Sequence, residues 1–345
     1  MKFIHLADAH LADKSSFNND MGSIIRKKSW ESFHNIFMAN TDVDFALIAG
    51  DLFERLYFSP KDFDKLFDIF KNFGKDIYYV SGNHDYFDDY NTIFLNNKPN
   101  NLHIFTEESL SLFEKENLRV YGLSYKDRIY KNDFPYDLIL DDKFFNILLV
   151  HGDISPNPTN YLDLDPLKLN KIAFDYIALG HIHKASNINN IYYPGSIEPH
   201  DFTDIYDYGY IRYDDGKINH IDSSLLSFNS LDIYPNDFKS EAEILDFINQ
   251  KLSDKINFLR INLKEESEID YKNLKKKINA EYVEINEAYD KDLFNLGDLY
   301  PNSLLSKFDK QFENADNQIS MLARQVGLEA ILRSKKWLYI LKSSI

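Results

Sequence analysis

Aspartate, asparagine and histidine side chains recur in short segments, each at the end of an apolar run. Divalent metals bind carboxylate, imidazole and amide oxygen ligands, and one carboxylate can bridge two metals. Any one of these segments alone is a weak signal, but together and in this order they predict two-metal chemistry on phosphate esters. The segments are Asp8-Ala9-His10, Gly50-Asp51, Gly82-Asn83-His84-Asp85, His151-Gly152 and Gly180-His181-Ile182-His183.

The spacing inside the segments suits two adjacent ions. Asp8 and His10 alternate around Ala9, so both can face one ion at the end of a strand. Asp51 follows the flexible Gly50, where the backbone can turn sharply, and is the natural bridging ligand. His181 and His183 also alternate, so each ion can take one imidazole.

Simpler interpretations exist for the single residues. A lone Asp-x-His or Gly-Asp is more often chance than a ligand, and Gly-Asn favours a turn. We interpret Asp85 and Asp153 as loop-capping or supporting groups rather than ligands. His5, inside the first apolar run, is expected to be a core residue, and the remaining histidines that carry no motif are His34, His103 and His220.

Strands and helices alternate along the first part of the chain, which predicts a layered α/β domain. The strands read as continuously apolar, as expected of strands covered on both faces. We expect strands at 2–7, 44–49, 77–80, 118–122, 146–150 and 176–179, and helices at 22–39, 61–73 and 88–97.

The pattern changes near residue 222, where a β-α-β-α-β order begins. It predicts strands at 227–234, 256–263 and 281–286 and helices at 240–252 and 270–279. From 303 the sequence is helical, and Gly327 is expected to break or kink this helix before a second stretch at 328–341. We therefore expect three parts: 1–222, a capping domain at 223–290, and a helical segment at 291–345.

Composition limits the class of protein. The 345 residues are 44% apolar and carry a formal charge of −16, which argues against broad, non-specific coating of nucleic acid. Cysteine is absent, which excludes disulfides and thiolate metal sites and favours a cytoplasmic location. No window is long and apolar enough for a membrane span, and the start of the chain does not read as a signal peptide.

The segments match the pattern D-x-H, G-D, G-N-H-[DE], H and G-H-x-H, so the chain resembles the calcineurin-like metallophosphoesterases from residue 1 to about 200. The resemblance implies a β-sandwich flanked by helices. It also implies that His84 is no ligand but a general acid or transition-state stabiliser. The implied ligands are Asp8, His10, Asp51 and His183 for the first metal, and Asp51, Asn83, His151 and His181 for the second.

The implied reaction is attack by a metal-bridging water in line with the scissile bond, while His84 protonates or neutralises the leaving group. Glu54 lies three residues after Asp51 and is expected to bond to His84 and raise its pKa.

Three further segments are similar to SbcD-type DNA repair exonucleases. They are Gly50-Asp-Leu-Phe-Glu54, Tyr193-Pro-Gly-Ser196 followed by Gly209-Tyr-Ile211, and the β-α-β-α-β module containing 258–263. The resemblance implies a manganese-dependent DNA exonuclease with endonuclease activity in double-strand break repair. It also implies that the tail at 303–341 docks an SbcC-type ABC ATPase, although this helix can equally pack on the core.

Contacts to a partner copy or substrate are less specific. The wide apolar stripe of 61–73, with 88–97, fits a homodimer contact or the core. Arg55 partly matches the phosphate-binding arginine in the Asp-Arg-Gly segment of protein phosphatases. Lys126 and Arg128 belong to a loop that suits nucleic-acid contact or simple solvation, and His200 is a candidate for the cleft rim.

Other functions stay open at this level. A small-molecule phosphodiesterase or a protein phosphatase would use the same ligands. A non-catalytic scaffold stabilised by metal is a different class of hypothesis, and the intact His84 argues against it, because a scaffold has no use for this side chain.

Overall fold

The computed structural model describes residues 1–14, 17, 19–88, 92–155, 157, 159–267, 269–287, 304–312 and 318–333. The chain divides into two compact units. The first comprises Met1–Ser230, Asn249–Arg260 and Ile278–Val283, and the second comprises Leu231–Ile248, Ile261–Lys277 and Glu284–Ile345.

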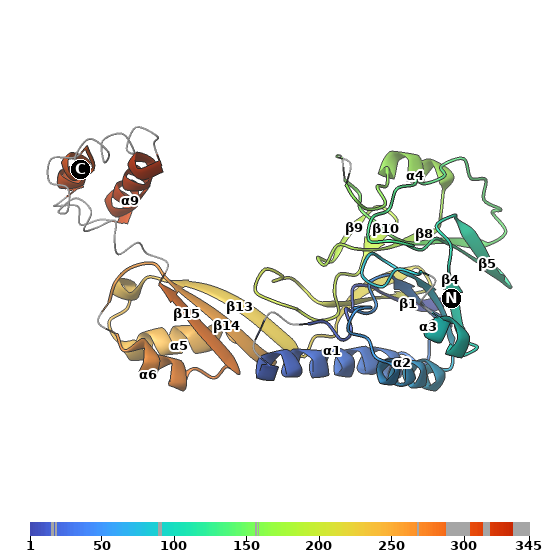
Figure 1. Ribbon diagram of the computed structural model, residues 1–345, viewed down its shortest axis with the longest axis horizontal. Coiled ribbons are helices and arrows are strands. Elements are labelled where there is room, and N and C mark those ends of the chain that lie inside the picture. The colour runs from blue at the N-terminus through green and yellow to red at the C-terminus, as the bar shows by residue number, and fades with distance from the viewer. Residues whose placement is uncertain are drawn as a thin grey trace. The chain divides into compact units, whose positions relative to one another are not determined.

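The first sheet of the first unit has six strands in the order β12-β11-β1-β2-β3-β4 (Figure 1). Strands β1 to β4 are parallel, and β11 pairs antiparallel with both β1 and β12. The strands are β1 (Lys2–Leu6), β2 (Phe45–Ala49), β3 (Asp76–Val80), β4 (Leu102–Phe105), β11 (Gly209–Asp214) and β12 (Lys217–Asp222).

The second sheet also has six strands, in the order β5-β6-β7-β8-β10-β9. Its strands β6, β7, β8 and β10 are parallel, and the two outer strands β5 and β9 are antiparallel to their neighbours. The strands are β5 (Ser111–Lys115), β6 (Leu118–Gly122), β7 (Phe145–His151), β8 (Tyr176–Gly180), β9 (Ser186–Ile188) and β10 (Ile191–Tyr193).

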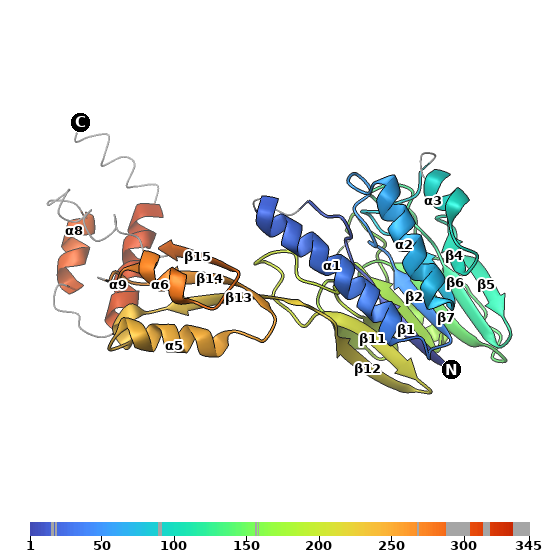
Figure 2. The same ribbon diagram turned by 90° about the horizontal axis from the view of Figure 1, so that it is seen from below.

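Helices cover the outer faces of the two sheets, and this makes a four-layer sandwich. Because side chains alternate along a strand, Phe3 of β1 lies in the core between the sheets, while Ile4 packs toward the helices. Helices α1 (Asn19–Ala39), α2 (Pro60–Phe73) and α3 (Thr92–Asn97) cover the first sheet, and α4 (Pro166–Ile172) covers the second (Figures 1 and 2). The predicted layered α/β fold and its six predicted strands are confirmed.

Helix α2 begins and ends at strong signals. The Ser59 side chain and Asp62 form a capping box, and Gly74 ends the helix with a φ of 68°. Five of its apolar residues are buried in the protein's own core, and Phe63 packs against the same core while partly exposed. The stripe that suggested a homodimer contact is therefore accounted for within the chain, and the homodimer itself stays a prediction.

A third sheet, in the order β13-β14-β15, carries the predicted β-α-β-α-β element order. Each of its strands begins in residues of the first unit and ends in residues of the second. The elements are β13 (Leu226–Ile233), a 3₁₀ turn (Pro235–Asp237), α5 (Glu241–Lys251), β14 (Ile256–Leu263), α6 (Tyr271–Lys277) and β15 (Tyr282–Glu287).

The second unit also holds α8 (Leu304–Asp309), a 3₁₀ turn (Lys310–Phe312) and α9 (Gln318–Arg333). The expected break at Gly327 is wrong, because α9 runs through this residue. Gly327 instead lets the Phe308 ring approach, since a Cβ there would lie 2.1 Å from that ring. Residues 334–341 of the expected second helix lie outside the described residues. No helix among the described residues has the length and apolar character needed to cross a membrane.

Candidate metal centre

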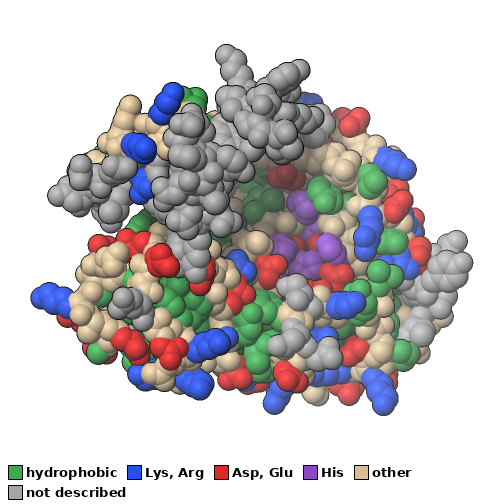
Figure 3. Space-filling view, turned by 60° about the vertical axis from the view of Figure 1, so that its left-hand side comes forward, with side chains coloured by type: hydrophobic (Ala, Val, Ile, Leu, Met, Phe, Trp, Pro, Cys, Tyr) green, Lys and Arg blue, Asp and Glu red, His purple; other side chains and the backbone are tan. Residues whose placement is uncertain are grey.

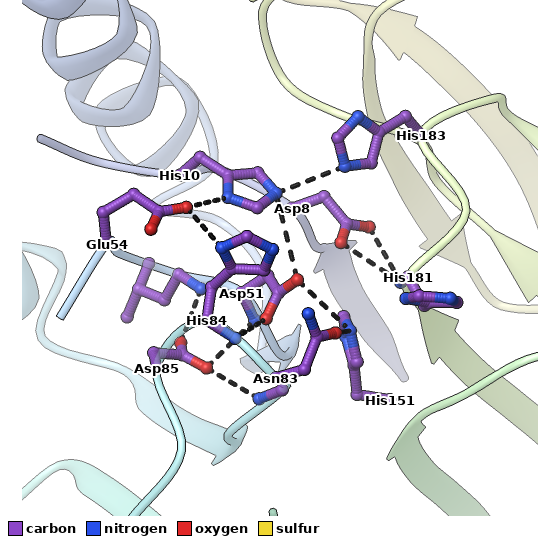
Figure 4. Close-up of polar contacts among 12 residues, drawn as sticks. Asp8, His10, Asp51, Glu54, Asn83, His84, Asp85, His151, His181 and His183 are labelled. Atoms are coloured by element: carbon purple, nitrogen blue, oxygen red, sulfur yellow. Dashed lines mark hydrogen bonds and ion pairs between the residues drawn. The ribbon is translucent and has the colours of Figure 1, made fainter. Parts of the chain in front are cut away.

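The seven predicted metal ligands and His84 lie together at the carboxyl ends of neighbouring strands (Figure 4). Parallel strands in one sheet end at the same edge, so segments far apart in sequence converge there. Asp8 follows β1, Asp51 follows β2, and Asn83 and His84 follow β3 in the first sheet. From the second sheet, His151 ends β7, and His181 and His183 follow β8. Histidine side chains also gather in one place in Figure 3.

The ligand atoms form two groups that share Asp8, and Asp51 lies between them. In the first group, the ligand atoms of Asp8, His10 and His183 lie within 4.8 Å of one another, and the Nε2 atoms of the two histidines are 3.2 Å apart. In the second, Asp8, Asp51 and His151 meet the same limit. The Asp51 Oδ2 atom is 3.3 Å from His151 Nε2 and 3.9 Å from His10 Nε2, so it faces both groups.

Asn83 and His181 lie beside the second group and contact its residues in different ways. The amide oxygen of Asn83 is 3.1 Å from His151 Nε2, which places a neutral oxygen donor beside the imidazole. The backbone N–H of His181 donates to both oxygens of Asp8 at 3.1 Å. Its ring lies 5.2 Å from the His151 ring and packs against Tyr161 at 4.1 Å between centroids. His181 as a metal ligand stays a prediction.

The backbone at four of these residues has positive φ angles, which side chains other than glycine rarely adopt. The angles are 50° at Asp8, 42° at His10, 48° at Asp51 and 98° at His181. Each such residue costs about 1–3 kcal/mol and persists only where the surroundings hold it. Backbone hydrogen bonds from Asp8 to Gly50 (3.1 Å) and from His10 to Asp51 (3.0 Å) tie the two strand ends together.

Gly50 is required between these strand ends for two reasons. Its φ of 85° is in the left-handed region, and a Cβ at this position would lie 2.4 Å from His151 Nδ1. The same imidazole bonds through Nδ1 to the carbonyl oxygen of Ala49 at 2.9 Å. His151 therefore presents Nε2 to the site, as a metal ligand must.

Two carboxylates are buried in the site, with 0% of Asp8 and 2% of Asp51 exposed. Burial raises the pKa of Asp8. Burial acts in the same direction on Asp51, but the facing histidines, His151 first, hold the pKa of Asp51 well below its usual range. Buried carboxylates with imidazole and amide donors are a donor set that suits divalent transition metals. The residues therefore fit two such ions.

Asp85 holds the loop behind the ligands, as expected for a supporting group. Its carboxylate accepts hydrogen bonds from the backbone N–H groups of Asp51 (3.2 Å), Leu52 (2.6 Å) and Gly82 (2.6 Å). The side chain is fully buried, and burial together with the charge of Asp51 raises the pKa of Asp85 to about 6.

Glu54 contacts two histidines with one carboxylate oxygen. The Oε1 atom is 2.6 Å from His84 Nδ1 and 2.9 Å from His10 Nδ1 (Figure 4). Burial acts to lower the pKa of His84, but the contact with Glu54 and the charge of Asp51 outweigh it, so the pKa of His84 is raised. The expected contact with His84 is present, and the contact with His10 is additional.

Sequence reasoning missed two supports of the ligands. Asp204 Oδ2 is 3.1 Å from His183 Nδ1, which fixes the orientation of that imidazole. Tyr161 packs on His181 as described above. Neither residue lies in a motif, and no signal in a single sequence relates them to histidines about 20 residues away.

The four residues predicted to contact substrate are Arg55, Lys126, Arg128 and His200, and they are not all close to the metal centre. Arg55 pairs with Asp88 at 2.6 Å and stacks on Tyr86, two residues after His84. The His200 ring lies 5.2 Å from the His10 ring. Lys126 pairs instead with Glu107 at 3.6 Å. In the described part of the chain, neither Lys126 nor Arg128 forms a hydrogen bond or ion pair with a residue of the metal centre.

Residues 1–185, just over half of the chain, match the calcineurin-like phosphoesterase family. The chain is 31% identical over 232 residues to the uncharacterized metallophosphoesterase YhaO of Bacillus subtilis. That match covers 61% of this chain and 56% of the length of YhaO. A solved dimetal phosphatase of Danio rerio, LOC 393393, is 12% identical with a TM-score of 0.40, over 61% of this chain and 91% of that one.

Metal binding is expected to release protons, because imidazoles must be neutral to bind a metal. Burial acts to lower the pKa of His151, but the charge of Asp51 outweighs it and raises this pKa to about 9 in the metal-free protein. For His183, Asp204 similarly outweighs burial and raises the pKa to about 9. Both imidazoles are therefore protonated below pH 9 without metal, and metal affinity should rise with pH up to that value.

Titration calorimetry with Mn²⁺ at pH 7, in buffers of different ionisation enthalpy, measures this release directly. We expect one to two protons per protein. The variant Asp204→Asn should release fewer, because its His183 loses the raised pKa. Equal heats in all buffers would contradict the assignment of these histidines as ligands.

Proposed function

The chain belongs to the calcineurin-like phosphoesterase family, and from this membership and the geometry above we propose that it is a manganese-dependent DNA nuclease of the SbcD type. The observation that carries the phosphodiesterase assignment is the pair of ligand groups that share Asp8 and flank Asp51, with His84 beside them and paired with Glu54. Metallophosphoesterase chemistry follows from the family and these ligands. The DNA substrate is the proposed part.

In phosphodiester hydrolysis, different residues of the chain hold the metals, donate a proton and orient the proton donor. When bound, two divalent ions supply an activated water and positive charge for the phosphate oxygens. His84, 38% exposed at its side chain, is accessible to a substrate and carries a raised pKa. It therefore supplies a proton, or positive charge, to the leaving oxygen. Glu54 keeps the His84 imidazole oriented through Nδ1, which leaves Nε2 to face the substrate.

Two features support DNA over a phosphoprotein substrate. The segment that follows Asp51 ends in Glu54, whose carboxylate hydrogen-bonds to His10 and lies 2.6 Å from His84 Nδ1. Protein phosphatases have Asp-Arg-Gly in this region, and the chain has Glu54-Arg55-Leu56. The β-α-β-α-β order of β13 to β15 is the order expected of the capping module of SbcD-type nucleases.

We further propose that the chain acts with an SbcC-type ABC ATPase and as a homodimer. Three apolar side chains of α9 support an ATPase docking face. Ile319, Leu322 and Val326 follow helical spacing and are 82%, 62% and 59% exposed. Exposed apolar groups on one helix face are typical of a surface that binds a partner.

A substrate panel tests the proposed function. With Mn²⁺, the wild type should degrade single- or double-stranded DNA and a small phosphodiester, but not a phosphopeptide. His84→Ser should lower kcat by about 10²–10⁴-fold, the usual contribution of a general acid, while bound metal is unchanged. Phosphopeptide turnover without DNA cleavage would identify a phosphatase. No turnover of any substrate by metal-loaded protein would favour a scaffold.

The pH dependence of kcat tests the role of Glu54. His84 acts in its protonated form, so activity should fall as pH rises through its pKa. Glu54→Gln removes the charge that raises this pKa, and the alkaline limb should move to lower pH.

Glu54 also contacts the predicted ligand His10, so the substitution could weaken metal binding. Assays at saturating Mn²⁺ with a measured metal content separate that loss from the shift in the pKa of His84. Glu31→Gln, which removes an exposed carboxylate paired with Lys28, is the matched control and should leave the profile in place. An unchanged profile for Glu54→Gln would show that Glu54 does not tune His84.

Removal of the C-terminal segment tests whether it docks the proposed ATPase. A chain ending before Leu304 should lose co-purification with a coexpressed SbcC-type ATPase and keep metal-dependent hydrolysis of the small phosphodiester. Ile319→Asp with Leu322→Asp should have the same effect in the full chain. Loss of folding on truncation would instead assign the tail to the core of the second unit.

A further inference from the structure

A pocket of about 500 Å³ lies between α1, α2 and the segments that follow the ligands His10 and Asp51. Ala12 lines it and is two residues from His10, a span of at most about 7 Å. The backbone N–H of Glu54 donates to the carbonyl of Leu11 at 3.0 Å, which joins the two segments. The pocket therefore opens beside the metal centre. Its larger side chains are Lys14, Arg26, Lys27, Trp30, Tyr57 and Lys65.

The charge of this pocket is opposite to that of the protein. Four of the lining side chains are cationic, in a chain with a formal charge of −16. The single lining carboxylate, Asp62, is engaged by the backbone N–H and hydroxyl of Ser59 at 2.8 and 2.6 Å. Across the part of the chain that the structure describes, none of the four cations has a carboxylate within 4.0 Å. Grouped cations repel one another, so an anion would stabilise this arrangement.

The pocket has two aromatic side chains, of which Trp30 is buried and Tyr57 is exposed. Trp30 is buried, stacks on Phe58 with centroids 5.8 Å apart, and has the Lys65 ammonium 4.2 Å from its ring. Tyr57 is 49% exposed. An exposed ring beside cations is the combination with which proteins bind single-stranded nucleic acid, since bases stack on the ring and phosphates contact the cations.

We propose that this pocket binds a backbone phosphate of a nucleic-acid strand at a nucleotide next to the one being cleaved, with the neighbouring base on Tyr57. The inference rests on the proposed function, because it names the substrate of the same metal centre as a polyanionic strand. The pocket gives an acidic protein a local attraction for that strand, and it has no contact to make with a small phosphodiester.

The first experiment compares substrates of different length. The variant Lys14→Gln/Arg26→Gln/Lys27→Gln removes three exposed pocket charges and leaves Lys65 on Trp30. The ratio of kcat/KM for a 20-nucleotide single strand to that for a small phosphodiester should fall at least about tenfold at low salt. The salt dependence of log kcat/KM for the strand should become shallower by about 0.7, the change expected for one lost phosphate contact on a single strand.

The matched control is Lys143→Gln/Lys171→Gln/Lys217→Gln, which removes the same charge from exposed positions elsewhere in the first unit. It should leave the ratio unchanged. An equal fall for the control would reduce the effect to net charge and overturn the proposal. So would an unchanged ratio for the pocket variant.

The second experiment measures binding without catalysis, so that a failure of the nuclease assignment is distinguishable from a failure of the pocket. Fluorescence anisotropy of a labelled strand with metal-free protein should show about tenfold weaker binding for the pocket variant than for the control. If the wild type cleaves no nucleic acid but this difference in affinity is found, the nuclease assignment is contradicted while binding of a strand by the pocket is supported. Equal affinities of the pocket variant and the control would contradict strand binding by the pocket.

Inorganic phosphate distinguishes a strand from a free anion. Millimolar phosphate should compete weakly, since it offers one contact and no base. Displacement of the strand by phosphate at concentrations comparable to those of the strand would identify a free-phosphate site and overturn the assignment.

Discussion

Two carboxylates held out of water, those of Asp8 and Asp51, are the constraint around which the rest of the site is organised. Charge in such a place requires a counter-charge within a few ångströms. Without metal, a proton on His151 supplies part of it, because the charge of Asp51 outweighs burial and raises the pKa of His151 to about 9. Asp204, and then Asp8, raise the pKa of His183 to about 9 in the same way. With metal, the ions replace these protons. Three features maintain the spacing of the ligands in both the metal-free and the metal-bound site. They are the hydrogen bonds between the strand ends, the buried Asp85 and Gly50 beside His151.

Much of this arrangement could be predicted from the sequence because the ligands follow strands that are parallel neighbours. Once 2–7, 44–49 and 77–80 are assigned as strands of one sheet, Asp8, Asp51 and Asn83 must meet at its edge. Glu54 could be placed beside His84 on resemblance. Helix α4 carried a missed local signal, the cap of Asp165 before Pro166.

Other features depend on tertiary contacts that one sequence does not encode locally. Strand β11 pairs with β1 about 200 residues away, and Asp204 reaches His183 from a loop with no motif. Helix α9 continues through Gly327 because a phenylalanine from α8 fills the space of the missing side chain. In each case the deciding partner is distant in the chain or is recognised only by its packing.

The loop from Glu198 to Asp204 connects the metal centre to the beginning of β13. Glu198 is buried and accepts bonds from Ser32 and from the backbone N–H groups of Leu225 and Leu226. Phe202 packs on Phe228 of β13 with centroids 5.0 Å apart. The loop that orients the His183 imidazole is thus anchored to α1 and to the first residues of the third sheet.

The left-handed backbone at four residues of the metal centre belongs to the polypeptide and not to any ion. The backbone of these ligands is held by the hydrogen bonds between the strand ends, from Asp8 to Gly50 and from His10 to Asp51. Divalent transition metals differ in affinity for one donor set in a fixed order. Which ion occupies such a site therefore depends on the geometry and type of these ligands as well as on the local supply of metals.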